Sequence, residues 1–538
     1  MKKALCSFVV LMLIVSMGGM QPAQAEVKEG YKLYVMAPLT EISDWDAFQA
    51  KLKTMKKNGV YALTTDIWWG MVERKGDNQF DWSYYEKYAE AVEESGLKWV
   101  PIMSTHQCGG NVGDDCSVPI PSWVWKKDKT ENMAFKSESG YVNKEALAPW
   151  WDGTARQYEE FYRSFARQFA DEKELIAKIY LSGGPAGELR YPSYQFADGW
   201  DWPERGQLQA YTEGAKKDFR DSLKKKYKNI KKLNVAWGSR YQHWADIEPP
   251  AGDAFFTSGD AYKTVYGKDF MHWYQGELET HMIKISKAAH KQFDRTFDVP
   301  IGIKISGVHW KMNDPSMPHA AEYSTGYFDY ERLLDHVKKA DLALTFTCLE
   351  MDDANAGVAP YYSAPKTLVT QIVALANERG ISLNGENALA LINNEWGFDN
   401  SAEMAFNYGF EGFTLLRMNY LFGDAGNPTN EFRMMIDKLA LTPLPVKMNV
   451  EQVPETAKKV YVIGDRGEIG RWNPNAYKYK LIKNGDGTWS GTFNLAANRT
   501  YSFKFLIETA SGERIWQEGR NNQFRTPKAG NAVYNGSW

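Results

Sequence analysis

The residues Leu181-Ser-Gly-Gly-Pro-Ala-Gly-Glu-Leu-Arg-Tyr-Pro-Ser-Tyr194 join an apolar segment to a loop that carries an acidic side chain. The preceding segment, 176–181, reads Ile-Ala-Lys-Ile-Tyr-Leu and is typical of a short buried strand. Three glycines and a proline then interrupt regular structure, which places Glu188 on a tight loop at the end of that strand. For Glu188 alone, a solvent-exposed turn and a general acid are equally good interpretations.

A second stretch, Ile381-Ser-Leu-Asn-Gly-Glu-Asn-Ala-Leu389, repeats this arrangement and brings Gly385 and Glu386 to the end of another short strand. Two carboxylates at strand ends are what glycoside hydrolysis requires, because one protonates a leaving oxygen while the other activates water or attacks the sugar. The pair therefore favours a catalytic site over two unrelated turns.

Apolar strand-like runs alternate with amphipathic helical segments along most of the chain. Eight such runs separated by helices predict a (β/α)8 barrel, an α/β fold whose chemistry lies at the carboxyl ends of the strands. The first helix is expected to begin after Asp44, which can cap it. Long segments around residues 109–150 and 191–260 are expected to form a binding cleft. The strand-like runs are residues 33–39, 60–69, 98–105, 177–182, 300–306, 342–349, 381–384 and 412–418.

Residues 1–25 have the pattern of a secretory signal peptide: Lys2 and Lys3, an apolar run over 4–17, and Ala23-Gln-Ala25 as a cleavage site. The apolar run is too short to span a membrane, so we expect an exported protein without a membrane partner. Removal of this peptide leaves 62 basic and 67 acidic residues, a net charge of -5, without long blocks of either sign. Nucleic acid is therefore not an expected partner.

Three cysteines remain after the signal peptide, namely Cys108, Cys116 and Cys348. Export favours a disulfide between Cys108 and Cys116 around a small glycine-rich loop, with Cys348 left as an odd thiol. A zinc site is the weaker interpretation, because no second close pair of Cys or His accompanies them.

The alternation of helices and strands ends near residues 441–445, and 460–538 show short alternating strands with turns such as Asn484-Gly485. We therefore expect a catalytic barrel over 26–445 and a separate β-sandwich domain over 446–538.

Polar residues gather where the predicted barrel strands end, and the barrel geometry would bring them to one face. Each has a simpler explanation: Asp66 could cap a helix, His106 could lie in the core, and Lys304 could extend its amine to the rim. Together they are harder to dismiss, because buried polar groups without partners destabilise a fold. Glu350 and Asp115 are expected to support the site or face solvent. The strand-end residues are Asp66, His106, Glu188, Lys304, His309, Thr347, Glu386, Asn387 and Arg417.

Five motifs in order resemble the β-amylase family of glycoside hydrolases: Thr65-Asp-Ile-Trp-Trp-Gly70, His106-Gln-Cys-Gly-Gly-Asn-Val-Gly-Asp114, Gly183-Gly-Pro-Ala-Gly-Glu-Leu-Arg-Tyr-Pro192, Thr345-Phe-Thr-Cys-Leu-Glu-Met351 and Gly385-Glu-Asn-Ala-Leu389. The resemblance covers the whole barrel. It implies an inverting exo-hydrolase that releases β-maltose from the non-reducing ends of α-1,4-glucans such as starch. Glu188 would be the general acid and Glu386 the general base. The implied sugar contacts are Asp66, His106, Asp114, Lys304, His309, Thr347, Asn387, Ala388 and Arg417.

The same resemblance extends to a metal ion, a lid and a second sugar site. A structural calcium ion is implied, although Gln157 stands where a carboxylate is expected. Segment 109–114 is implied to be a mobile lid that excludes water. The C-terminal domain resembles a starch-binding domain, and Trp489 is assigned to its core. The implied calcium ligands are Glu73, Asp77, Asn78, Gln157 and Glu160, and the implied starch platform is Trp472, Lys504 and Trp516.

Two other functions stay open from the sequence. A retaining glycosidase would need the two carboxylates about 5 to 5.5 Å apart, whereas inversion needs about 6.5 to 9.5 Å. A non-catalytic starch-binding protein is less consistent with an intact Glu188 and Glu386. A close cation would lower the pKa of a general acid, so Lys304 is expected to contact a substrate hydroxyl rather than Glu188. No organic cofactor is expected, and the chain is expected to be a monomer.

Overall fold

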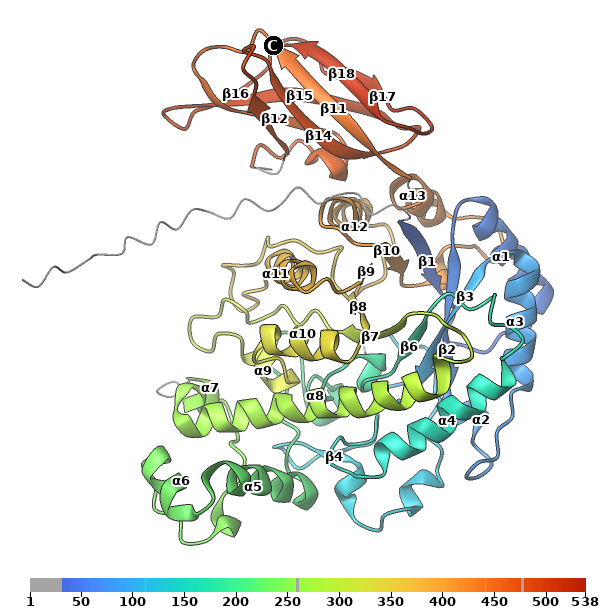
Figure 1. The fold of residues 1–538 in the computed structure, drawn as a ribbon, viewed down its shortest axis with the longest axis vertical. Coiled ribbons are helices and arrows are strands. Elements are labelled where there is room, and N and C mark those ends of the chain that lie inside the picture. The colour runs from blue at the N-terminus through green and yellow to red at the C-terminus, as the bar shows by residue number, and fades with distance from the viewer. Residues whose placement is uncertain (1–30, 112, 258–260, 441, 476–478) are drawn as a thin grey trace, which may run out of the picture.

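The computed structural model describes residues 31–111, 113–257, 261–440, 442–475 and 479–538. The signal peptide predicted over residues 1–25 lies outside these ranges. Eight parallel strands close into a barrel in the order β1-β10-β9-β8-β7-β6-β3-β2, which confirms the predicted (β/α)8 architecture (Figure 1). Among the described residues, none of the helices is long and apolar enough to cross a membrane.

The barrel strands are short and buried on both faces, which is why their sequences are continuous apolar runs rather than alternating ones. Strand β9 differs from the predicted run at residues 381–384, because it begins two residues later and includes Glu386. Glu386 is therefore held by hydrogen bonds between strands rather than by a loop. The strands are β1 Lys32–Met36, β2 Ala62–Trp68, β3 Lys98–Ser104, β6 Ile179–Leu181, β7 Ile301–Ile305, β8 Ala343–Phe346, β9 Leu383–Glu386 and β10 Gly412–Leu415.

Helices surround the barrel, and the first begins as predicted, because the Asp44 side chain accepts the backbone N–H of Ala47. The aromatic side chains of α4 are buried against its neighbours, as expected from their helical spacing. The helices outside the barrel are α1 Trp45–Lys57, α2 Trp69–Val72, α3 Ser83–Ser95, α4 Thr154–Gln168, α8 Val265–Phe293, α9 Ala320–Thr325, α10 Tyr330–Lys339, α11 Pro365–Glu378, α12 Glu395–Asn407 and α13 Asn430–Lys438.

The two long insertions form a separate layer on one side of the barrel, seen at the bottom of Figure 1 around α5 and α6. They contain little regular structure before the helices α5 to α7. Their elements include β4 Phe135–Lys136, β5 Val142–Asn143, α5 Glu213–Tyr227, α6 Ile230–Trp237 and α7 Ala254–Thr257. The short 3-10 turn η3 Pro185–Gly187 lies between β6 and the second insertion.

Among its described residues, the C-terminal domain consists mainly of strands, with a short 3-10 turn, η8 Gly467–Ile469, after β12. Strand β11 pairs with β14 and β18 along its length, so the chain enters this sheet at Pro443, three residues before the expected boundary. Trp489 is only 7% exposed and packs in the core of this domain, which confirms its assignment. The strands are β11 Pro443–Glu451, β12 Ala457–Gly464, β13 Lys480–Lys483, β14 Trp489–Ala496, β15 Thr500–Thr509, β16 Arg514–Trp516, β17 Asn522–Arg525 and β18 Ala532–Ser537.

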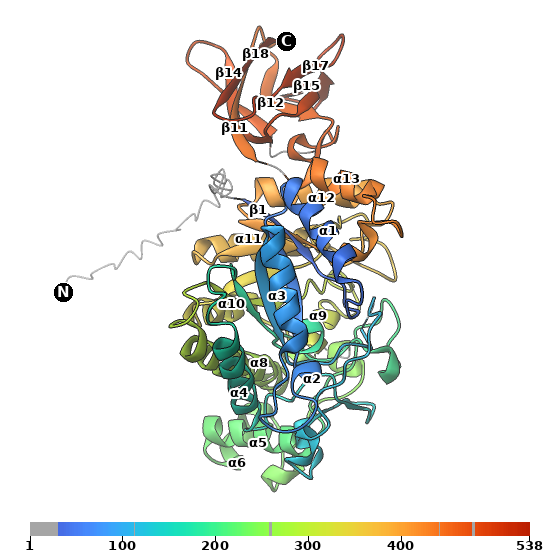
Figure 2. The ribbon, with the colours of Figure 1, turned by 90° about the vertical axis from the view of Figure 1, so that its right-hand side faces the viewer.

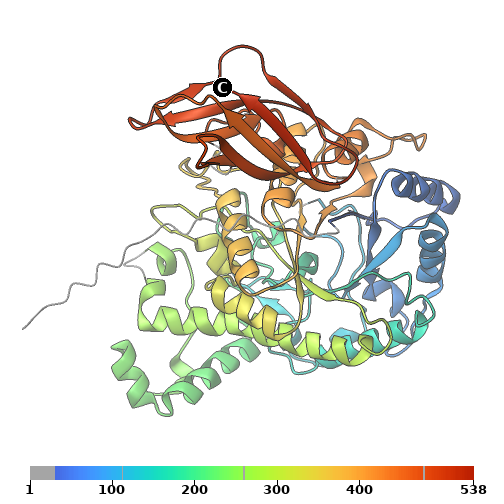
Figure 3. The ribbon, with the colours of Figure 1, turned by 45° about the horizontal axis from the view of Figure 1, so that its top comes forward.

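The C-terminal domain rests on α12 and α13 of the barrel (Figures 2 and 3). Ala405 and Phe406 at the end of α12 are buried in the core of that domain rather than in the barrel. Asp437 of α13 forms ion pairs across the contact with Arg466 at 3.1 Å and with Arg499 at 3.0 Å. The contact is therefore both apolar and charged.

Candidate active site

A pocket opens at the carboxyl ends of the barrel strands and contains five of the residues predicted to contact sugar. Its lining combines strand ends with the loop after β3, as the barrel geometry requires. The predicted residues in its lining are Asp66, His106, Asp114, Lys304 and Arg417.

Lys304 links the two predicted catalytic carboxylates. Its backbone forms a parallel bridge with Glu188, and its ammonium group donates to both carboxylate oxygens of Glu386, at 2.7 and 2.9 Å. The tertiary structure therefore brings together two glutamates that are far apart in the chain. The Lys304 amine lies against the predicted base rather than the predicted acid, and Lys304 also lines the pocket, so its contact with a substrate hydroxyl stays a prediction.

Glu188 is rigidly placed. It follows η3, where Gly187 has a φ of +78°, a conformation that favours glycine. A Cβ at Gly183 would lie 2.8 Å from the Cα of Leu189, so the loop is packed too closely for a larger residue. The Glu188 side chain is 13% exposed and can reach a substrate.

Arg190 is the cation closest to Glu188, and the sequence analysis did not assign it a role. Its Nε donates to Glu188 Oε2 at 2.8 Å, and its Nη2 donates to Asn111 Oδ1 at 3.0 Å. Its guanidinium lies 4.1 Å from the ring centre of Tyr194. The spacing Glu-Leu-Arg was the available indication, since residues two apart share one side of an extended segment. Arg190 therefore joins the predicted acid to the predicted lid.

Glu386 is buried, and burial raises its pKa above the usual value, while Lys304 opposes that rise. A raised pKa makes a carboxylate a stronger base, and the neighbouring ammonium keeps it ionised. These are the properties that a general base requires.

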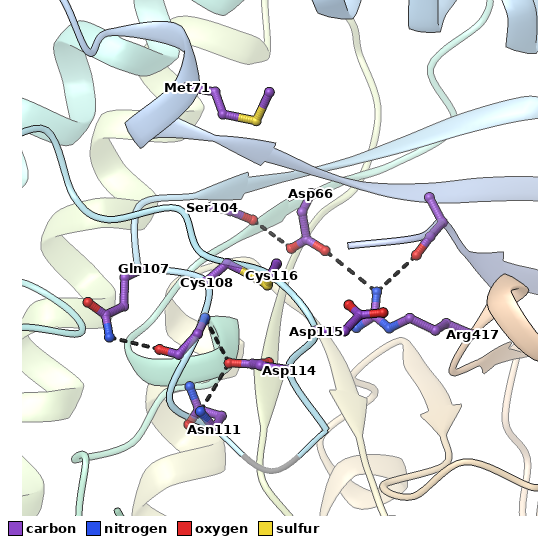
Figure 4. The surroundings of a disulfide bond; sticks show 12 residues. Asp66, Met71, Ser104, Gln107, Cys108, Asn111, Asp114, Asp115, Cys116 and Arg417 are labelled. Carbon is purple, nitrogen blue, oxygen red and sulfur yellow. Dashed lines mark hydrogen bonds and ion pairs between the residues drawn. A yellow bond between two sulfur atoms is a disulfide. The ribbon is translucent and has the colours of Figure 1, made fainter. Parts of the chain in front are cut away.

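Asp66 and Asp114 each organise part of the pocket wall (Figure 4). Asp66 accepts a hydrogen bond from Ser104 Oγ at 2.8 Å and lies 3.9 Å from Arg417 Nη1. Asp114 Oδ2 accepts the backbone N–H groups of Gly109 and Asn111, at 2.9 and 3.0 Å. Asp114 thus holds the 109–114 loop in shape from within.

Cys108 and Cys116 are joined by a disulfide at the base of the same loop, with Cα atoms 5.7 Å apart. Both sulfurs are therefore unavailable to a metal, although Asp114 lies near them. On the outer side, Asn419 Nδ2 donates to Asp115 Oδ2 at 3.1 Å. The disulfide closes the segment on itself, and Asp115 connects it to the residues after β10.

His106 and His309 are uncharged near neutral pH, since burial lowers the pKa of each to about 4. Their Nδ1 atoms are hydrogen-bonded to Ser182 Oγ at 2.8 Å and to Ser363 Oγ at 2.7 Å, which fixes the ring orientations. Neutral imidazoles can hydrogen-bond sugar hydroxyls without adding charge beside Glu188 and Glu386.

The remaining predicted sugar contacts lie on segments fixed by hydrogen bonds to the backbone. Thr347 Oγ1 accepts the N–H of Gly307 at 2.8 Å. Asn387 accepts the N–H of Leu416 at 2.9 Å and donates to two carbonyls, so its side chain supports the barrel end rather than pointing freely at substrate.

Glu350 supports the segment after the predicted base. It is buried, burial raises its pKa to about 7, and it accepts the backbone N–H groups of Ala388 and Leu389 at 2.8 to 3.1 Å. It therefore positions the predicted sugar contact Ala388. Of the two expectations for Glu350, support of the site and exposure to solvent, the structure shows the first.

The predicted calcium ligands come from the segment after β2 and from α4. Glu73 accepts the indole N–H of Trp69 and the backbone N–H of Asn78, both at 2.5 Å. Burial raises the pKa of Glu73 to about 7, and the charges of Asp77 and Glu160 add to the rise. Gln157 donates to Glu160 at 3.2 Å.

Two further features help to judge whether the predicted calcium ligands could hold an ion. Asp77 already forms an ion pair with Lys127 at 2.7 Å. Gln157 Oε1 is buried and has no hydrogen-bond partner within the described part of the chain. A buried oxygen without a donor, next to Glu160, suits calcium, although the carboxylates of Glu73, Asp77 and Glu160 do not gather within 4.8 Å of one another in the structure as described.

The predicted starch platform is brought together in the C-terminal domain. The rings of Trp472 and Trp516 have centres 6.4 Å apart and planes at 56°. Lys504 Nζ donates to the carbonyl groups of Gln517 and Gly519, at 2.7 and 2.8 Å. Lys504 therefore supports the loop that follows Trp516, and the two indoles form the candidate sugar surface.

Comparisons with known proteins cover both domains. Residues 34–441 match glycosyl hydrolase family 14, and residues 443–535 match the starch binding domain family. A thermophilic beta-amylase of Thermoanaerobacterium thermosulfurigenes is 47% identical over 96% of this chain and 94% of its own length. A beta-amylase of Bacillus cereus is 48% identical over 94% of both chains. The catalytic domain of a beta-amylase from Paenibacillus polymyxa superposes with a TM-score of 0.75 at 53% identity, covering 77% of this chain and 99% of that one.

Proposed function

Because the chain belongs to glycosyl hydrolase family 14 and ends in a starch binding domain, we propose that it releases β-maltose from the non-reducing ends of α-1,4-glucans with inversion at the anomeric carbon. The observation that carries this proposal is the pair of glutamates at one end of the barrel, with Glu188 partly exposed and Glu386 buried against Lys304. Starch is the substrate that accounts for both domains.

In the proposed reaction Glu188 donates its proton to the glycosidic oxygen as the bond to the anomeric carbon breaks. Glu386 takes a proton from a water molecule, whose oxygen bonds to the anomeric carbon from the opposite face of the ring. The products are β-maltose and a glucan shortened by two residues. The lysine beside Glu386 supports this role, since it keeps the carboxylate ionised before the water is activated.

The pocket contacts support a substrate held by hydroxyl recognition. Neutral His106 and Asp66 offer hydrogen-bonding groups in the wall of the pocket, and His309 offers a second neutral imidazole after β7. The 109–114 loop borders the same pocket, and its closure over a sugar would exclude bulk water from the reaction.

The test is proton NMR of the enzyme acting on soluble starch or maltotetraose. The first-formed maltose is expected in the β form, followed by slow mutarotation. Maltose released in the α form would mean retention and would overturn the mechanism. No release of reducing sugar would favour a non-catalytic starch-binding protein.

We further propose that Glu73, Asp77, Asn78, Gln157 and Glu160 hold one structural calcium ion. The buried Gln157 oxygen without a donor supports this set, because the ion would supply the missing partner. The ion would join α4 to the segment after β2 and would have no part in the chemistry.

We propose that the protein is secreted after removal of residues 1–25 and acts as a monomer. The leader sequence supports export, and an oxidising location is consistent with the Cys108–Cys116 disulfide. N-terminal sequencing of the protein from culture medium, with light scattering on the purified enzyme, tests both points.

A further inference from the structure

A line of exposed apolar side chains leads away from the catalytic glutamate along the segment between β9 and α12. Leu389, Ile392 and Trp396 are 52%, 55% and 52% exposed, although Glu386 just before them is buried. The segment lies on the catalytic face, because α12 begins where the loop after β9 ends. Large apolar side chains gathered at one place on a surface commonly mark a binding site.

Trp396 is exposed and yet firmly held. Its indole N–H donates to Asp352 Oδ2 at 2.9 Å, which fixes one edge of the ring. The guanidinium of Arg471 lies 3.8 Å from the ring centre and covers one face. Arg471 in turn pairs with the buried Asp399 at 3.1 Å. The indole therefore presents its remaining surface in a fixed orientation, and a ligand that stacks on it loses little side-chain entropy.

Trp396 is connected to both candidate sugar sites through short stretches of the chain. On one side, Leu389 is three residues from Glu386 in the sequence. On the other side, Arg471, which covers the Trp396 ring, is followed directly by Trp472 of the starch platform. Trp396 is thus ten residues along the chain from Glu386 and in contact with the sequence neighbour of Trp472.

We infer that Trp396 is an outer stacking site for α-1,4-glucan, which guides a chain between the C-terminal platform and the catalytic cleft. An α-glucan is the occupant that fits, because sugar rings stack their apolar faces on indoles and the sites on both sides take the same polymer. The inference rests on the proposed function. It adds a binding surface made jointly by the barrel and the C-terminal domain.

The experiment compares a long and a short substrate. For Trp396→Ala, KM on soluble amylose is expected to rise about threefold to tenfold, as for the loss of one aromatic stacking contact. Turnover of maltotetraose is expected to stay unchanged, because a chain of four sugars placed in the cleft ends before it reaches Trp396. Trp396→Phe, which keeps a flat ring, should show a smaller rise than Trp396→Met, which keeps apolar bulk without a ring.

Binding without turnover provides the second measurement. In a Glu188→Gln background that also carries Trp472→Ala and Trp516→Ala, amylose affinity measured by calorimetry should fall again when Trp396 becomes alanine. Equal KM on amylose for wild type, Trp396→Met and Trp396→Ala would overturn the inference. Equal losses on amylose and maltotetraose would also overturn it, since they would show a general loss of packing between the domains. Absence of maltose release by the wild type would instead reject the proposed function.

Discussion

At the scale of single residues, the two glutamates have different proposed roles, and a glutamine in place of either one keeps the shape of the side chain. Glu188→Gln and Glu386→Gln are each expected to lower kcat on soluble starch by about 10²- to 10⁴-fold, the usual contribution of a general acid or base. Initial-rate assays with a melting curve of each variant provide the measurement. Activity within tenfold of wild type in either variant would remove that glutamate from the mechanism.

Lys304 is expected to set the acid limb of the pH profile. Burial raises the pKa of Glu386 and Lys304 lowers it again, so Lys304→Met should raise the pKa of the base further. Because the base must be ionised, the limb of kcat/KM that falls toward low pH should move to higher pH. Lys304→Arg keeps the positive charge and serves as the control. An unmoved limb in Lys304→Met would mean that another group controls the ionisation of Glu386.

Cys348 is expected to be dispensable and slow to react. Its side chain is fully buried, and burial raises the pKa of its thiol well above the ordinary value, so little reactive thiolate is present. Thiol reagents should therefore inhibit slowly, and Cys348→Ser should keep full activity and resist them. Time courses of inactivation test this. Rapid inactivation of the wild type, or an inactive serine variant, would contradict it.

At the scale of elements, the proposed calcium ion joins α4 to the segment after β2. Excess calcium at about 100 times its dissociation constant would stabilise the fold by about 2.7 kcal/mol, so EDTA should lower the melting temperature. Gln157→Glu adds a carboxylate and should tighten calcium binding, whereas Gln157→Leu should abolish the melting shift. Calorimetric titration with calcium provides a reading independent of activity. Identical melting curves with calcium and with EDTA would reject the site.

The barrel strands show where the sequence pattern predicted an element correctly and where it misplaced the end of one. The apolar runs identified all eight barrel strands, because strands buried on both faces leave little room for polar residues. The end of β9 was placed too early, since Gly385 resembles a turn residue. In the barrel a Cβ at that glycine would lie 2.2 Å from Leu349, so close packing rather than a turn requires glycine there.

At the scale of the whole molecule, the C-terminal domain should matter for granules and not for dissolved chains. Trp472→Ala with Trp516→Ala is expected to abolish most adsorption to raw starch, while turnover of maltotetraose stays nearly unchanged. Granule pull-down and a soluble assay on the same preparations measure this. Unchanged adsorption would reject the assigned platform. The double variant is a cleaner test than truncation near Pro443, because truncation would expose Ala405 and Phe406 of α12.

The sequence by itself determined the class of fold and the two-domain order, and it predicted the two glutamates that the structure places at one end of the barrel. Each of these depends on local pattern: buried strands, glycine-rich strand ends and motifs of contiguous residues. Residues that act through their nearest neighbours in the chain, such as Asp44 at its helix, are predictable for the same reason.

Only the tertiary structure decided which charge serves which carboxylate. Lys304 and Glu386 are 82 residues apart in the sequence. They meet because β7 and β9 are both paired with β8, so that only one strand separates them in the barrel. Arg190, two residues from Glu188, takes the place beside the acid. The Glu-Leu-Arg spacing indicated the Arg190 contact, whereas strand pairing alone brings Lys304 to Glu386 across a distance that no sequence spacing encodes. The contact between Trp396 and Arg471 could not be predicted from the sequence for the same reason, because the two residues are close only in space.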